Sequence, residues 1–228
     1  MTQNFTMGLA VLSLVAGGAI AEESDTKLAD DPTKVITKVG LSYSDKWTLS
    51  GSVAVGPVSK INVRLSDTGE WTAGGSYLFN FGIVNVSASQ RELNSGVTQT
   101  QYSIGSYAPI YRATDNPKGW QVFAMFGANY TEGNGGAAVL DMPSGLSTEV
   151  ESRGGYVGAM ALKPISPLVV FKSFGVLSRG SNDYSGYGIG GGFTFNLSKR
   201  DTINVMAFYS DNSFGQNDSV SIGYRREF

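Results

Sequence analysis

The chain has 228 residues and a formal net charge of −2 at pH 7, so no basic field points to nucleic acid as a partner. It contains no cysteine, which excludes a disulfide framework and thiolate metal sites. We expect no metal ion and no cofactor.

The first segment of the chain has the pattern of a secretory signal peptide. An apolar run from Met7 to Ala16 is followed by Gly17-Gly18 and then by Ala19-Ile20-Ala21, which fits cleavage at an A-x-A site after Ala21. A short membrane anchor is the alternative, but a transmembrane helix needs about 20 apolar residues. We therefore expect residues 1–21 to direct export of the chain.

The next segment, residues 22–34, reads EESDTKLADDPTK and is polar with mixed charge. Such a composition is typical of flexible segments that bury little apolar surface. We expect a flexible periplasmic leader here, followed by a single domain over residues 35–228.

From about residue 35 the sequence alternates apolar and polar residues, with turn residues at regular breaks. This period of two predicts strands with two unlike faces. The expected strands are 35–43, 47–55, 60–66, 70–79, 83–91, 98–112, 120–130, 151–163, 168–178, 186–197, 202–210 and a last one from about 217. The longest gap, 132–150, predicts a loop that covers the mouth, folds inward or stays on the surface.

The strand at 120–130 has the clearest alternation, with aromatic residues at both ends of its apolar face. About ten residues of tilted strand cross a bilayer, and aromatic residues gather at its two interfaces. We therefore expect a girdle of aromatic side chains that includes Trp47, Trp71, Trp120 and Tyr130.

Alternation alone does not decide which face is inside, and a soluble β-sandwich or a lipocalin-like barrel would turn the apolar face inward. The polar face here consists mainly of Gly, Ser, Thr and Asn, which suits an enclosed wet lumen. The predicted fold is all-β, a transmembrane antiparallel up-and-down β-barrel of about 12 strands, with eight or ten as alternatives. The residues expected to line its lumen are Lys38, Arg64, Asn129, Asn196, Asn204 and Arg225.

The last strand ends in SIGYRREF, with Val220, Ile222 and Tyr224 at two-residue steps and Phe228 as the last residue. This ending resembles the C-terminal assembly signal of Gram-negative outer-membrane barrels. The resemblance implies the cell outer membrane as location, with membrane lipid and the barrel-assembly machinery as partners. In those families an aromatic residue often stands where this chain has Arg226.

In size and strand rhythm the chain also looks like the small 12-stranded oligosaccharide porins that are specific for acidic sugars. Those channels are expected to line the lumen with many Arg and Lys residues. The inward set expected here is thin, so we do not extend the specificity for acidic sugars to this chain.

Catalysis has little support in the sequence, because it contains no histidine, the side chain best suited to proton transfer near neutral pH. Asp141 and Glu149 share the long loop with two serines, but polar loop residues are the default. The glycines at 188, 190 and 192 lack the spacing, helix and lysine of a phosphate-binding loop. Inward glycines on a strand indicate space or the close approach of a neighbouring segment.

We therefore expect a protein without enzymatic activity. The leading hypothesis is an outer-membrane, porin-like channel for passive diffusion of small hydrophilic solutes, because about twelve strands leave room for water. The alternative is a non-conducting structural or surface-interaction barrel that acts through its outer loops.

Overall fold

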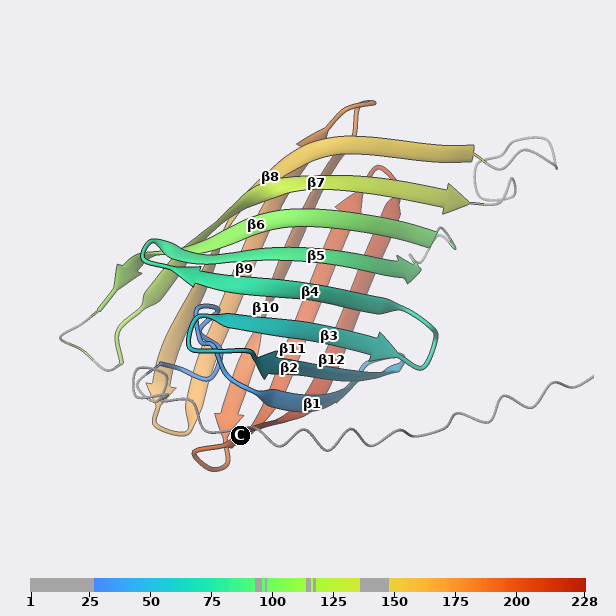
Figure 1. Cartoon of the computed structure of the whole chain (residues 1–228). Helices are drawn as coiled ribbons and strands as arrows, with labels where there is room; N and C mark the ends of the chain where they lie inside the picture. Colours follow the sequence, from blue (N-terminus) through green and yellow to red (C-terminus); the bar gives the residue numbers. More distant parts are fainter. Residues whose placement is uncertain (1–26, 93–95, 97, 114–115, 117, 136–147) are drawn as a thin grey trace, which may run out of the picture.

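The protein is a closed antiparallel β-barrel, seen here in a computed structural model that describes residues 27–92, 96, 98–113, 116, 118–135 and 148–228 (Figure 1). This confirms the predicted fold class and twelve strands, and it rules out eight or ten. No helix within the described ranges is long and apolar enough to cross a membrane. The strands are β1 (Lys38–Tyr43), β2 (Trp47–Ala54), β3 (Ser59–Ser66), β4 (Trp71–Phe79), β5 (Gly82–Glu92), β6 (Thr98–Arg112), β7 (Gln121–Gly135), β8 (Thr148–Ser166), β9 (Val169–Gly180), β10 (Ser185–Asn196), β11 (Asp201–Asn212) and β12 (Gly215–Glu227).

Each strand pairs with its neighbours in sequence, and β12 closes the ring by pairing with β1. The closing register runs from Lys38 opposite Glu227 to Tyr43 opposite Ile222. We call the end of the barrel where Lys38 and Glu227 lie the terminal end. The longest connection, between β7 and β8, joins strands at the opposite end.

The expected loop at 132–150 is wrong at both of its borders. Strand β7 continues to Gly135, and β8 already begins at Thr148. The two strands pair along this whole extension, from Gln121 opposite Leu162 to Gly135 opposite Thr148. Residues 136–147 lie outside the described residues, so a loop that folds into the lumen stays a prediction. The predicted signal peptide also lies outside them.

The outer wall of the barrel is apolar. On β7, Trp120 just before the strand and Phe126 within it are 42% and 45% exposed, whereas Phe123 on the alternate face is fully buried. A soluble sandwich or a lipocalin-like barrel would bury the apolar face instead. Further exposed apolar residues on the outer wall include Leu41, Leu49, Ile61, Val63, Ile104, Val157, Leu177, Ile189, Val220 and Ile222.

The inner face is more varied than the sequence suggests, because several large side chains reach into the lumen. Phe123, Leu162 and Val170 form a buried cluster on β7, β8 and β9, against which Met160 packs. A second pair, Phe174 on β9 and Phe208 on β11, stacks with ring centroids 5.9 Å apart. Large inward side chains therefore occupy part of the space that small residues would leave open.

Candidate functional site

The first residues that the structure describes, 27–34, lie inside the terminal end of the barrel (Figure 1, blue). They were expected to belong to a flexible leader, but the side chains of Asp31, Thr33 and Lys34 are buried. We call residues 27–34 the inner segment. Its side chains and carbonyls contact residues of β3, β6, β7, β8, β9, β10 and β12. Because these strands go most of the way around the ring, the inner segment extends across the lumen.

Asp30 is the centre of the polar contacts made by the inner segment. Its Oδ1 atom lies 3.3 Å from Lys172 Nζ and 3.1 Å from Arg225 Nη1, and Thr194 donates a hydrogen bond to Oδ2. Asn204 Oδ1 accepts a hydrogen bond from Lys172 at 2.9 Å and lies 2.7 Å from Thr194 Oγ1, whose one proton is donated to Asp30. Residues of three strands, β9, β10 and β12, thus supply the ligands of one carboxylate, and Asn204 on β11 binds two of these ligands from behind.

The charge state of Asp30 follows from these neighbours. Burial acts to raise its pKa, but the charges of Lys172 and Arg225 and the hydrogen bond from Thr194 act in the opposite direction. The net result is a pKa below the ordinary value of 3.8. Asp30 is therefore ionised at neutral pH.

The rest of the inner segment is fixed at separate points of the ring. Arg112 on β6 donates to Asp31 Oδ2 at 2.9 Å. Lys34 Nζ lies 2.7 Å from Glu227 Oε2 on β12, and Lys60 on β3 donates to the Lys34 carbonyl at 2.7 Å. Two acids and one lysine of the inner segment therefore pair with charges on the inner wall.

An apolar anchor completes the attachment. Leu28 packs against the buried cluster of Phe123, Leu162 and Val170. Arg112 also lies over the Phe123 ring, 5.4 Å from its centroid. The segment is thus held by one apolar contact with residues of β7, β8 and β9 and by ion pairs with residues of β6, β9 and β12.

The inner wall is richer in cations than the sequence suggested. The described strands place seven basic residues and one acidic residue, Glu227, at inward positions. The basic residues are Lys38, Lys60, Arg64, Arg91, Arg112, Lys172 and Arg225. Sequence analysis did not select Lys60, Arg91 or Arg112. Lys60 and Arg91 lie at the margins of the predicted strands 60–66 and 83–91, where facing is hard to assign.

The facing of Arg112 could not follow from strict alternation. The register of β6 against β7 shifts between Pro109 and Tyr111, so Ile110 is an extra residue in the ladder. A bulge of this kind reverses the facing of every residue beyond it. Arg112 therefore pairs with the inward Gln121.

The six residues expected in the lumen occupy inward positions of their strands, but they do not form one cluster. Arg225 and Asn204 belong to the Asp30 network. Asn129 is buried on β7, where its amide donates to Thr131 at 3.4 Å. The others are Lys38 beside Arg225 on the neighbouring strand, the exposed Arg64 on β3, and Asn196, whose amide donates to the Pro167 carbonyl.

The four aromatic residues expected in a girdle lie on the outer wall. Trp120 is at the terminal end, next to Phe171 at 6.3 Å between centroids. Trp47, Trp71 and Tyr130 lie toward the opposite end. The Trp71 indole donates to Gln90 at 3.0 Å, and the Tyr130 hydroxyl donates to Glu151 at 2.6 Å.

The C-terminal residues also face as the alternation predicts. Val220, Ile222 and Tyr224 are 70%, 54% and 43% exposed on the outer wall. Arg226 shares this wall and lies 3.1 Å from Asp201, which also accepts a hydrogen bond from Tyr224. Phe228 is 62% exposed, and its backbone N–H donates to the Thr37 carbonyl at 3.0 Å.

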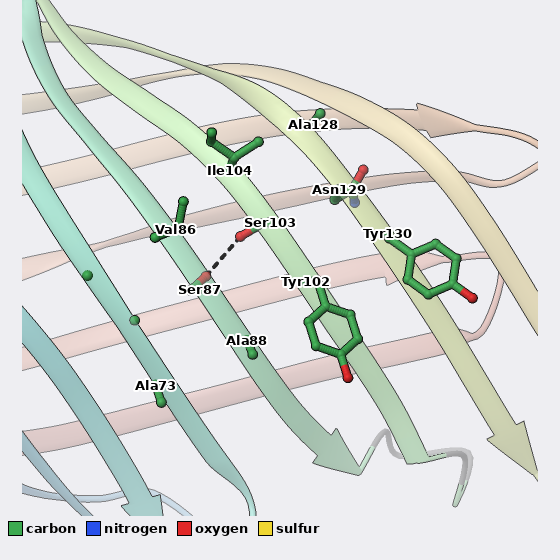
Figure 2. Close-up of a pocket in the computed structure, with 12 residues that line it drawn as sticks. Ala73, Val86, Ser87, Ala88, Tyr102, Ser103, Ile104, Ala128, Asn129 and Tyr130 are labelled. Atoms are coloured by element: carbon green, nitrogen blue, oxygen red, sulfur yellow. Dashed lines mark hydrogen bonds between the residues drawn. The ribbon is translucent and has the colours of Figure 1, made fainter.

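A shallow groove of about 630 Å³ lies across strands β4 to β7. Most of its lining residues are outward-facing, such as Ala73, Ala88 and Ala128, and Figure 2 shows Tyr102 and Tyr130 side by side in front of their strands. The hydrogen bond between Ser87 and Ser103, 2.8 Å long, lies between the same strands. The groove is part of the outer wall and is separate from the lumen.

The two alternative sites suggested by the sequence have different outcomes. A Cβ atom on Gly190 would lie 2.5 Å from Phe174 Cε1, so this glycine allows the close approach of a neighbouring ring. No helix follows it, because β10 continues to Asn196. Asp141, Ser144, Ser147 and the side chain of Glu149 fall outside the part of the chain that the structure describes.

Comparison with known proteins identifies the fold. The chain matches the translocator domain of autotransporter NalP from Neisseria meningitidis over 84% of its own length and 85% of that chain, with 14% identity and a TM-score of 0.56. It matches an outer-membrane channel from Pseudomonas putida F1 over 89% of its length and 99% of that chain, with 11% identity and a TM-score of 0.51.

No protein-family model and no curated protein matches the chain. The likeness in structure shows the fold, which is that of Gram-negative outer-membrane β-barrels of the size of small porins.

Proposed function

We propose that this chain is an outer-membrane channel for small hydrophilic solutes. The observation that carries the proposal is the closed barrel of twelve strands with an exposed apolar outer wall and a polar inner wall rich in Lys and Arg. A barrel of this size leaves a water-accessible interior where side chains do not fill it. The likeness to an outer-membrane channel supports this function.

The proposed location is the Gram-negative outer membrane, with export by the predicted signal peptide 1–21. In this setting the terminal end faces the periplasm, and membrane lipid surrounds the outer wall. The barrel-assembly machinery is the proposed partner in insertion, because the chain ends in exposed residues of the C-terminal pattern, including Phe228.

A specific observation favours the second candidate, a non-conducting barrel that acts through its outer loops. The inner segment extends across the terminal end, and Phe123 and Leu162 beside it are fully buried. A channel with this arrangement conducts only through the space that the inner segment leaves, or after the segment moves.

Planar-bilayer recordings separate the two candidates. We expect small, discrete conductance steps from the refolded wild type. We expect larger steps from Leu28→Ser, because this change removes the apolar anchor of the inner segment. Leu168→Ser is the matched control, since Leu168 is 63% exposed in a turn at the same end. Barrels that shift in gel mobility on heating, yet give no steps in any of the three proteins, would support the non-conducting candidate.

A further inference from the structure

We propose that the cations at the terminal end of the lumen form a binding site for anionic solutes with more than one carboxylate. In the structure the chain occupies this site itself, through Asp30 and Asp31. The inference rests on the proposed channel function and adds to it the class of solute. The inner segment then acts as a tethered ligand that the solute displaces.

The first part of the evidence is the way in which Asp30 is bound. Its side chain is 6% exposed and lies between an ammonium group and a guanidinium group, with a hydroxyl donor on its second oxygen. Positive charge together with directed donors is how proteins bind carboxylates in general. Lys172, Thr194 and Arg225 belong to the strands of the wall, so the site remains when Asp30 leaves.

A second carboxylate subsite lies on another wall of the lumen. Arg112 on β6 binds Asp31, the next residue of the chain. Lys172 and Arg225, which bind Asp30, lie on β9 and β12. Two neighbouring carboxylates are thus bound by cations from separate strands. A free solute needs at least two carboxylates to replace both contacts.

The wall also has binding capacity that the inner segment does not use. The Nη1 atom of Arg225 binds Asp30. The Nε and Nη2 atoms of Arg225 are buried without a hydrogen-bond partner in the described part of the chain. Lys38 is adjacent on β1 and makes no ion pair with any residue within the described ranges. Unpartnered buried donors are costly, and an additional anionic oxygen would satisfy them.

The inner segment is attached in a way that allows exchange. The backbone-to-backbone hydrogen bonds described for it are turns within the segment, from Asp31 to Leu28 and from Lys34 to Asp31. Side chains and one apolar contact hold it to the wall. A tethered group competes at an effective concentration in the millimolar range, so a free anion binds the wild type weakly.

Titration calorimetry with citrate, on protein refolded in a zwitterionic detergent at low salt, tests the site without requiring conduction. We expect citrate to bind Asp30→Asn/Asp31→Asn at least tenfold more tightly than wild type, because the tethered carboxylates are neutralised while their shape is kept. Adding Lys172→Gln/Arg225→Gln to this variant should abolish binding. Asp45→Asn/Asp67→Asn, with two exposed acids in turns at the opposite end, is the charge-matched control and should bind as wild type does.

Three results would overturn the site: no citrate binding by the Asp30/Asp31 variant, binding that survives loss of Lys172 and Arg225, or equal tightening in the control. Binding of neutral maltotriose with the same pattern would overturn the anionic class. These outcomes are distinct from failure of the channel. Barrels that bind citrate as expected but never conduct contradict the proposed function alone, and barrels that conduct without binding contradict the anion site alone.

Discussion

Asp30 shows how a single side chain can couple the lumen to pH. Its carboxylate pairs with Lys172 on β9 and Arg225 on β12, and Thr194 on β10 donates a hydrogen bond to it. These groups favour the ionised form, so the pKa of Asp30 is below 3.8 when the inner segment is in place. A group whose pKa falls on folding contributes stability above its free pKa. That contribution is lost as the pH falls through the lower pKa of the bound state.

Acid should therefore release the inner segment. A nitroxide attached at Ala29→Cys reports the change, because the chain has no other cysteine. We expect a spectrum of an immobilised label at pH 7 that sharpens as the pH falls below about 3.8, the ordinary pKa of Asp. With Asp30→Asn the acid-dependent change should be smaller than in the wild type, because the contribution of the Asp30 carboxylate is gone while the pairs Asp31–Arg112 and Lys34–Glu227 remain. An immobile label in the wild type down to pH 2 would contradict this coupling.

The stacked rings of Phe174 and Phe208 inside the lumen limit the size of the side chain that the neighbouring strand can carry at residue 190. Phe174 on β9 lies over Gly190 on β10 and stacks on Phe208 of β11. A methyl group on Gly190 would overlap the Phe174 ring, and the stacked partner restricts how far this ring can move. On the outer wall beside it, a methyl group on Gly175 would have its nearest neighbour, Ile189 Cγ2, at 3.9 Å.

We expect Gly190→Ala to lower the free energy of unfolding by about 1–3 kcal/mol, the usual cost of overpacking. Gly175→Ala, one register position away, should be neutral or slightly stabilising, since it adds no clash and restricts the unfolded chain. Urea unfolding of both variants in lipid vesicles measures the difference. Equal stability of the two proteins would contradict this prediction, because the Phe174 and Phe208 rings would then move aside without lowering the free energy of unfolding.

Strands were the most predictable elements, because in each of them residues alternate between an apolar outer face and a more polar inner face. The facing of β12, with Ile222 out and Arg225 in, follows directly from this pattern. At the bulge after Pro109 the pattern fails, since one extra residue reverses the facing of Arg112. The inner segment was not predictable either. Its polar composition is typical of a flexible leader, and its partners, such as Lys172 and Arg225, are more than a hundred residues away in the sequence.

For the whole molecule, we propose that insertion and stability depend on different residues. Phe228 is exposed on the outer wall and contributes a backbone hydrogen bond to Thr37, so its ring adds little to the packing of the folded barrel. If the C-terminal residues are the assembly signal, the ring acts before folding is complete, through the assembly machinery.

Deleting Phe228 should therefore leave refolding in detergent almost unchanged, yet lower the fraction of assembled barrel in cells several-fold. Phe81→Ala is the matched control, because Phe81 is an exposed phenylalanine (55%) in a turn at the same end. Heat-modifiable gel mobility, applied to outer-membrane fractions and to refolded protein, gives both quantities. If both variants lose assembly in cells equally, the effect belongs to the outer wall and not to the terminus.

The ion pair between Lys34 and Glu227 joins a residue four positions before β1 to the last residue of β12. The seam between these two strands is also among the shortest ladders of the barrel, from Lys38–Glu227 to Tyr43–Ile222. The ring cannot close until β12 has been made, and the inner segment precedes β1 directly. Closing the seam and enclosing the inner segment are thus steps of one late event. The barrel leaves assembly with its tethered ligand already inside, and any solute that enters later meets an occupied binding site.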